Sequence, residues 1–183
     1  MSDTFERVVK HFEAAEMLFK ADPEGESIWA VLPGNHGSVT IFVKVEDEAM
    51  EVVAHHPLRI PENKRAALAE LITRIGPRNI KSRLEMDYDE GKLMTRSRIC
   101  FDPECGLVDE GVFFTIGVAV CALDCVHPAV MAILHQGKTA AEAARAFGEE
   151  GESEPPHANR FNLPKPEGNV PWEELPEDKL PNN

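Results

Sequence analysis

The chain has 183 residues, a length that suits one domain of ordinary size. Hydrophobic residues make up 43% of it and charged residues 28%, enough for both a core and a soluble surface. Its 19 basic and 32 acidic residues give a net charge of −13. This charge argues against nucleic acid or an anionic membrane as the main partner, because both would repel such a surface.

Neither a secretory signal nor a membrane span is predicted. The first residues, Met1 to Glu6, lack a basic region followed by an apolar one. The longest apolar run, 112–123, is shorter than the roughly 20 residues that a membrane helix needs. We therefore expect a cytoplasmic protein with no membrane partner, and reduced cysteines are the expected state in that compartment.

The N-terminal third is expected to form a helix followed by a meander of strands. Asp3 and Glu6 have the spacing of a capping box, and apolar residues recur at helical intervals as far as Phe19. This pattern predicts a helix over 3–21. Alternating apolar residues separated by short turns then predict antiparallel strands over 27–32, 38–46 and 49–55.

The middle of the chain repeats these signals. Pro61 favours a helix start and Gly76-Pro77 ends that helix. Strands are predicted over 84–88 and 93–101, and helices over 107–126, 129–136 and 139–147, with Pro128 kinking or breaking the first of these. The predicted fold is α+β, with a five-stranded antiparallel sheet and the order α-β-β-β-α-β-β-α plus C-terminal helices.

The composition changes near residue 150, so we expect a domain over 1–150 and a tail over 151–183. The tail is acidic and holds half of the 14 prolines. Such a segment buries too little apolar surface to offset the entropy of ordering, which predicts an extended conformation. Phe161, Leu163 and Trp172 are the residues that can attach it to the domain or to a partner.

Two stretches carry a resemblance to the YbjN-like domain family. One runs from Val53 to Pro61 (VAHHPLRIP) and is followed by Arg65, Leu71 and Asn79. The other runs from Leu84 to Gly91 (LEMDYDEG), followed by Arg96 and an apolar helix ending near Asp124 and Pro128. The resemblance covers roughly residues 3–137 and implies a type III secretion chaperone-like fold. It also implies a small, non-enzymatic, dimeric protein-binding protein of the kind described as bacterial sensory transduction regulators.

The four cysteines suggest an alternative function, a metal- or redox-responsive sensor. Cys121 and Cys125 share one helix face, and Cys100 and Cys105 flank the turn that enters the helix. Four soft ligands suit zinc, although the spacing of Cys100 and Cys105 lies at the loose limit of a zinc knuckle. The competing interpretation treats Cys121 and Cys125 as small core residues, which is the commoner use of a reduced cysteine.

No catalytic signature and no cofactor motif is present. His55 and His56 point to opposite faces of a strand, so they do not easily hold one ion together. A metal site would require His55 or His56 to converge with His36, His127 and a carboxylate, and solvent-facing or satisfied histidines are the favoured interpretation. The sequence lacks a G-x-S-x-G elbow and both glycine-rich phosphate-binding patterns. We therefore expect no enzyme activity and no cofactor.

The apolar helix near residues 112–126 is the feature with the clearest consequence. Its apolar residues occupy every side of a helical wheel, whereas a helix packed on a sheet hides one side only. The second cover is a helix of the same chain or another protein, and a homodimer is slightly favoured. The residues expected to bind protein are Val112, Phe113, Ile116, Val120 and Leu123.

Overall fold

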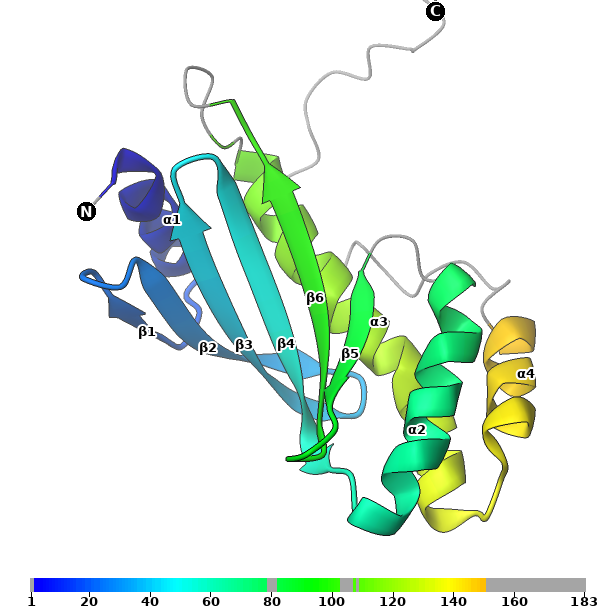
Figure 1. Ribbon diagram of the computed structural model, residues 1–183. Coiled ribbons are helices and arrows are strands. Elements are labelled where there is room, and N and C mark those ends of the chain that lie inside the picture. The colour runs from blue at the N-terminus through cyan, green and yellow to red at the C-terminus, as the bar shows by residue number, and fades with distance from the viewer. Residues whose placement is uncertain (1, 79–81, 103–106, 108, 151–183) are drawn as a thin grey trace, which may run out of the picture.

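The computed structural model describes residues 2–78, 82–102, 107 and 109–150. They form one antiparallel sheet with helices behind it, an α+β arrangement with the strand order β1-β2-β3-β4-β6-β5. Figure 1 looks onto the sheet face that no helix covers. α3 passes behind the sheet, and α2 and α4 lie together beyond the β5 edge.

The N-terminal helix is shorter than predicted, and a strand follows it. α1 spans Asp3–Ala14, and its N-cap is Ser2, whose Oγ accepts a hydrogen bond from the N–H of Phe5 at 3.2 Å. The backbone leaves the helix at Glu16, which has a φ of 52°. β1, Phe19–Asp22, then pairs with β2 at the edge of the sheet. The predicted helix over 3–21 is therefore wrong in its last third, and the sheet has six strands rather than five.

The remaining strands confirm the predicted positions. β2 spans Ser27–Gly34, β3 Gly37–Glu46, β4 Ala49–Arg59, β5 Arg83–Asp87 and β6 Lys92–Cys100. Along β3, Val39, Ile41, Val43 and Val45 are buried, and the residues between them are exposed or half-buried. This alternation gives the sheet one face that packs on the helices and one outer face.

The helix after Pro61 also lies where the sequence predicts it. α2 spans Glu62–Ile75, with Pro61 as its N-cap, and a short 3-10 turn over Gly76–Arg78 follows. Leu68, Leu71 and Ile75 are the buried residues of this helix. α2 connects β4 to the edge strand β5, and β6 lies between these two strands in the sheet.

The central helix is one continuous element and not two. α3 spans Asp109–His135 with Pro128 inside it, and α4 spans Ala140–Glu150. Proline removes one intrahelical hydrogen bond, a loss that usually kinks or breaks a helix. Here the Pro128 side chain is exposed, while Ala129, Val130 and Ile133 are buried. Burial of the residues after Pro128 is what keeps them in the same helix.

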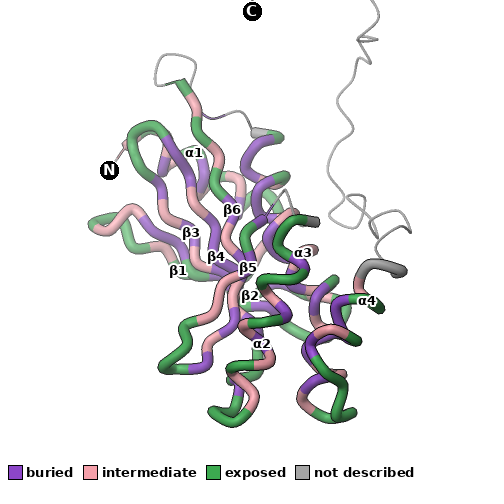
Figure 2. The backbone as a smooth tube through the Cα atoms, turned by 45° about the vertical axis from the view of Figure 1, so that its right-hand side comes forward, coloured by how far each residue is buried: buried purple, intermediate pink, exposed green. Residues whose placement is uncertain are grey.

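One hydrophobic core lies between the sheet and the helices. It joins Phe5, Val8 and Phe12 of α1 to the inner face of β2–β4 and to α3. Figure 2 shows these buried segments in the interior of the molecule, with exposed segments at the strand turns and on the outer sides of the helices. The predicted tail over 151–183 lies outside the described residues.

Candidate functional site

The side of α3 that faces away from the sheet is apolar and open. α3 packs on β4 and β6, and also contacts α4 and α2. Phe114 is 58% exposed, and Cys125 is also exposed. Half-buried small or apolar residues lie around them on the same side of the helix. We call this surface the α3 open side; it consists of Phe114, Gly117, Val118, Cys121, Ala122 and Cys125.

The charge pattern of α3 isolates this surface. Between Glu110 and His135 the only Asp, Glu, Lys or Arg residues are Glu110 itself and Asp124. The segment Glu110–His135 is therefore long and apolar enough to cross a membrane, although half of its most apolar window is buried in the domain. The core helix of a folded domain has the same properties. The open half is therefore a surface whose burial removes few charges from water.

The residues predicted to bind protein lie mostly on the opposite side of α3. Val112, Ile116, Val120 and Leu123 are buried in the core against the sheet. Phe113 is half-buried, and its ring contacts that of His11 in α1 at a centroid distance of 5.5 Å. The four buried side chains hold α3 on its own sheet, so a partner has to meet the α3 open side instead.

The cysteines are divided between two places. Cys121 and Cys125 lie on the α3 open side, with their Sγ atoms 4.0 Å apart, whereas Cys100 is exposed at the end of β6. Cys105 lies outside the described residues. The thiol contact with Cys121, and then partial desolvation of the Sγ atom, raise the pKa of Cys125, although the residue as a whole is exposed.

Three histidines meet where β4, the β2–β3 turn and α3 come together. His56 Nε2 lies 3.0 Å from His127 Nδ1, and the ring of His36 stacks on that of His127 at a centroid distance of 4.4 Å. Asp124, one turn before His127, accepts a hydrogen bond from the N–H of Asn35 at 2.9 Å. The structure therefore brings three histidines and a carboxylate together, and the contact between His56 and His127 fits the prediction of satisfied histidines.

Burial keeps two of these rings neutral. Burial lowers the pKa of His56, and the adjacent His127 lowers it further, against the hydrogen bond at Leu58. Burial and His36 lower the pKa of His127, against the attraction of Asp124. These lowered pKa values favour a pair of neutral rings, because a charged imidazolium would lose hydration here and would face another histidine.

The histidine cluster has little room for a ligand as it stands. The pocket beside it has space for about one water molecule. Within the described ranges, no group of three or more His, Cys, Asp or Glu side chains is arranged to hold a metal ion. The sequence analysis did not identify this cluster; the signal that could have indicated it is the placement of Asp124 and His127 three residues apart on one helix face.

Comparison with known proteins assigns no function to either surface. No protein-family model matches the chain, and no curated protein matches it. The resemblance to YbjN-like domains therefore stays a prediction from the sequence, and any function rests on the α3 open side and the surfaces around it.

Proposed function

We propose that this chain is a non-enzymatic protein-binding module of the cytoplasm, a chaperone-like protein or an adaptor in sensory regulation. We also propose that two copies pair through the α3 open side. One observation carries the proposal: α3 buries one side on its own sheet, while its α3 open side is half-buried and includes Phe114, which is 58% exposed. An exposed apolar surface of this extent is typical of association sites.

The spacing along the α3 open side suits contact with another helix. Phe114, Val118, Cys121 and Cys125 recur at intervals of four, three and four residues. This is the repeat that places side chains along one seam of a helix pair. None of these four residues is charged. Pairing along the seam therefore buries no like charges against each other, although each chain has a net charge of −13.

The seam is also complementary to itself in an antiparallel pair. A two-fold axis near residues 119 and 120 would place Phe114 of one copy opposite Cys125 of the other. It would also place Gly117 opposite Ala122, so small residues admit the neighbouring backbone and Phe114 fills the space beside a small side chain. Isologous contacts of this kind are the commonest basis of homodimers.

The chaperone-like part of the proposal has separate support. It is supported by the α+β arrangement with an antiparallel sheet and by the resemblance carried by the segments around His56 and Tyr88. Mild crosslinking of the intact protein in its native host, followed by purification, tests it. We expect a second protein to co-purify. A chain that is recovered with no other protein attached contradicts the client-binding part.

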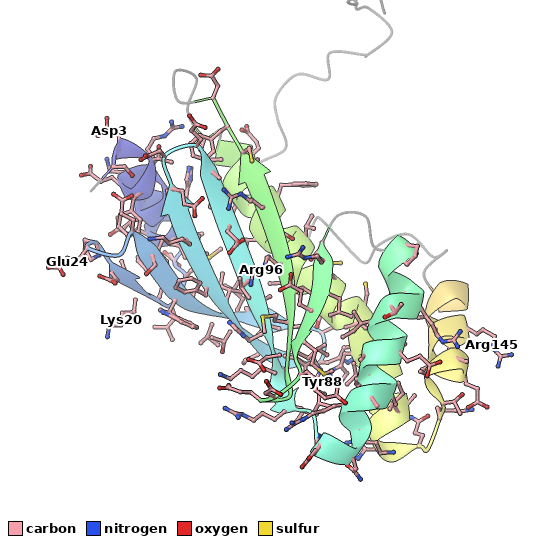
Figure 3. The ribbon with its side chains drawn as sticks, viewed as in Figure 1. Asp3, Lys20, Glu24, Tyr88, Arg96 and Arg145 are labelled. Carbon is pink, nitrogen blue, oxygen red and sulfur yellow. The ribbon has the colours of Figure 1, made fainter. Side chains whose placement is uncertain are left out.

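Light scattering tests the pairing. The intact chain is expected to have twice the mass of one chain at micromolar concentration, and Phe114→Glu is expected to have the monomer mass. Tyr88→Glu is the matched control, because Tyr88 is an aromatic residue of similar exposure, 52%, in the turn between β5 and β6. Figure 3 shows Tyr88 near the lower end of the sheet, beside the turn that joins β5 to β6. A wild-type chain that stays monomeric at about 100 μM, far above the Kd of a specific complex, contradicts the proposal.

A further inference from the structure

The outer face of the sheet carries a second apolar surface, independent of the α3 open side. In Figure 1 no helix of the described chain lies over this face. Trp29 of β2 is 46% exposed there and lies against the rings of its neighbours, with centroid distances of 4.8 Å to Phe42 and 6.0 Å to His55. We call these three residues the aromatic platform.

The strand register joins this platform and Val31 into a short apolar strip. Trp29 is paired with Phe42 across β2 and β3, and Val53, the partner of Phe42 in β4, is buried. In the next row, exposed Val31 lies two residues along β2 from Trp29. The Trp29 and Phe42 rings are tilted by 48° to one another. Exposed aromatic rings of this kind bind proline-rich segments in an extended conformation.

The charges around the strip are balanced, unlike those of the chain as a whole. Arg96, labelled in Figure 3, is paired with Glu51 and with Glu85, at 3.1 Å in the second case. At the outward positions of the strands, basic and acidic residues are similar in number: Lys20, Lys44, Arg59, Arg83, Lys92, Arg96 and Arg98 against Asp22, Glu46, Glu51, Glu85 and Asp87. With a net charge of −13, most of the acidic excess must lie elsewhere, so this face repels an acidic segment least.

One segment of the chain itself has the matching chemistry. Residues 151–183 hold seven prolines, the second of the two tryptophans (Trp172), and the apolar residues Phe161 and Leu163. Seven acidic residues against three basic ones give this segment a net charge of −4. It therefore combines proline, apolar anchors and negative charge, the combination that suits the aromatic platform and its balanced surroundings.

The covalent link to the domain keeps the segment 151–183 near the aromatic platform. The 11 residues from Glu150 to the first anchor, Phe161, span about 36 Å when extended, which is about the width of a domain of 150 residues. A segment linked to its site is present at an effective concentration of about 1 mM. A contact too weak to hold a free peptide is therefore still populated within one chain.

We propose that the proline-rich segment 151–183 docks in cis on the aromatic platform and covers Trp29, with Phe161 and Leu163 as its apolar anchors. The segment then acts as a built-in competitor for any protein that binds the outer face. This occupant is independent of pairing through the α3 open side, because the two surfaces lie on opposite sides of the sheet.

Fluorescence quenching of the full-length chain tests the docking. Trp172→Phe leaves Trp29 as the only tryptophan, so acrylamide quenching reports its exposure alone. Adding Phe161→Ser and Leu163→Ser to this variant is expected to raise the quenching constant of Trp29 about twofold. That is the change expected when a ring 46% exposed in the bare domain loses a cover. The matched control replaces His157 and Asn159 of the same segment by serine and is expected to leave the constant unchanged.

Two outcomes overturn the proposal. One is equal quenching of Trp29 with and without the anchor residues. The other is protection of Trp29 that disappears on dilution, which identifies a second copy as the cover. Repeating the measurement with Phe114→Glu added separates this proposal from the pairing of α3, because a monomer with a docked segment keeps Trp29 protected.

Discussion

His56 Nε2 lies 3.0 Å from His127 Nδ1, within hydrogen-bonding distance, and this contact links β4 to α3. On the other side of the His56 ring, Nδ1 lies 3.2 Å from the N–H nitrogen of Leu58 and 3.4 Å from the carbonyl oxygen of the same residue. When Nδ1 accepts from this N–H, the single proton of neutral His56 lies on Nε2. Protonation of either ring therefore disturbs the arrangement.

The first prediction concerns pH. The pKa values of His56 and His127 are lowered on folding, so the unfolded chain binds protons first as the pH falls. The contribution of these two histidines to the free energy of unfolding should be constant above about pH 6.5, the ordinary pKa of histidine. Below that pH the free energy of unfolding should decrease. Urea denaturation at pH 7.5 and at pH 5.5 measures the difference.

Replacing the pair should flatten this pH dependence. In the variant His56→Gln and His127→Gln we expect a smaller loss of stability between the two pH values, with His55, whose pKa is also lowered, accounting for part of the remainder. His135→Gln, an exposed histidine in the last turn of α3, is the control. An unchanged pH slope in the double variant would show that the pair does not carry the effect.

The second prediction separates the two sides of α3. Ile116 is fully buried, so Ile116→Ala should lower the free energy of unfolding by about 2–5 kcal/mol. Val118 is half-buried on the α3 open side, and Val118→Ala should cost about 0.5 kcal/mol in the monomer. Urea titration in the Phe114→Glu background measures both without a contribution from pairing. Equal losses would contradict the assignment of sides.

The third prediction concerns Gly91, in the turn between β5 and β6. Its φ is +66°, and a Cβ there would collide with the carbonyl oxygen of Ile60, just before α2. Gly91→Ala should therefore destabilise the fold by more than the roughly 1–2 kcal/mol that a left-handed conformation costs an L-residue. Gly76→Ala is the control, because Gly76 is right-handed and has open space around it. It should be neutral or slightly stabilising, by up to about 1 kcal/mol, when both are measured by thermal and urea unfolding.

The fourth prediction concerns Cys125. The thiol contact with Cys121 is the main reason why its pKa is raised. Cys125 should therefore react with iodoacetamide more slowly than a cysteine in a model peptide, and Cys121→Ala should speed the reaction by shifting its pH profile to lower pH. The rate of alkylation, followed by mass spectrometry of the Cys125 peptide between pH 7 and pH 10, gives the result. An unshifted profile in Cys121→Ala contradicts this cause.

Local patterns in the sequence predicted most of the elements. Period-two alternation located β2, β3 and β4, and the Pro61 and Gly76-Pro77 signals located α2. The strand β1 was missed because Phe12 and Phe19 are seven residues apart, a spacing that also continues a helix. The turn at Glu16 depends on a left-handed backbone in a residue other than glycine, which composition does not indicate.

The parts that depend on tertiary packing were not predictable in the same way. The sequence indicated that α3 has more apolar surface than one sheet covers, but it could not say which residues face the sheet. Pro128 is tolerated because it lies on the exposed side, which is a property of packing and not of the local sequence. His36, His56 and His127 come from three separate elements, so only the fold brings them together.

The central claim, that a second copy covers the α3 open side, is tested most directly by single-cysteine crosslinking. In the antiparallel pair with Phe114 opposite Cys125, the two copies of Cys121 are about 4.5 Å apart along the helix axis, and the two copies of Cys125 about 16 Å apart. With the other three cysteines replaced by serine, mild oxidation should link the Cys121 variant into a covalent dimer and leave the Cys125 and Cys100 variants unlinked. A Cys121 variant that stays monomeric, or that links no faster than the Cys100 variant, contradicts the account.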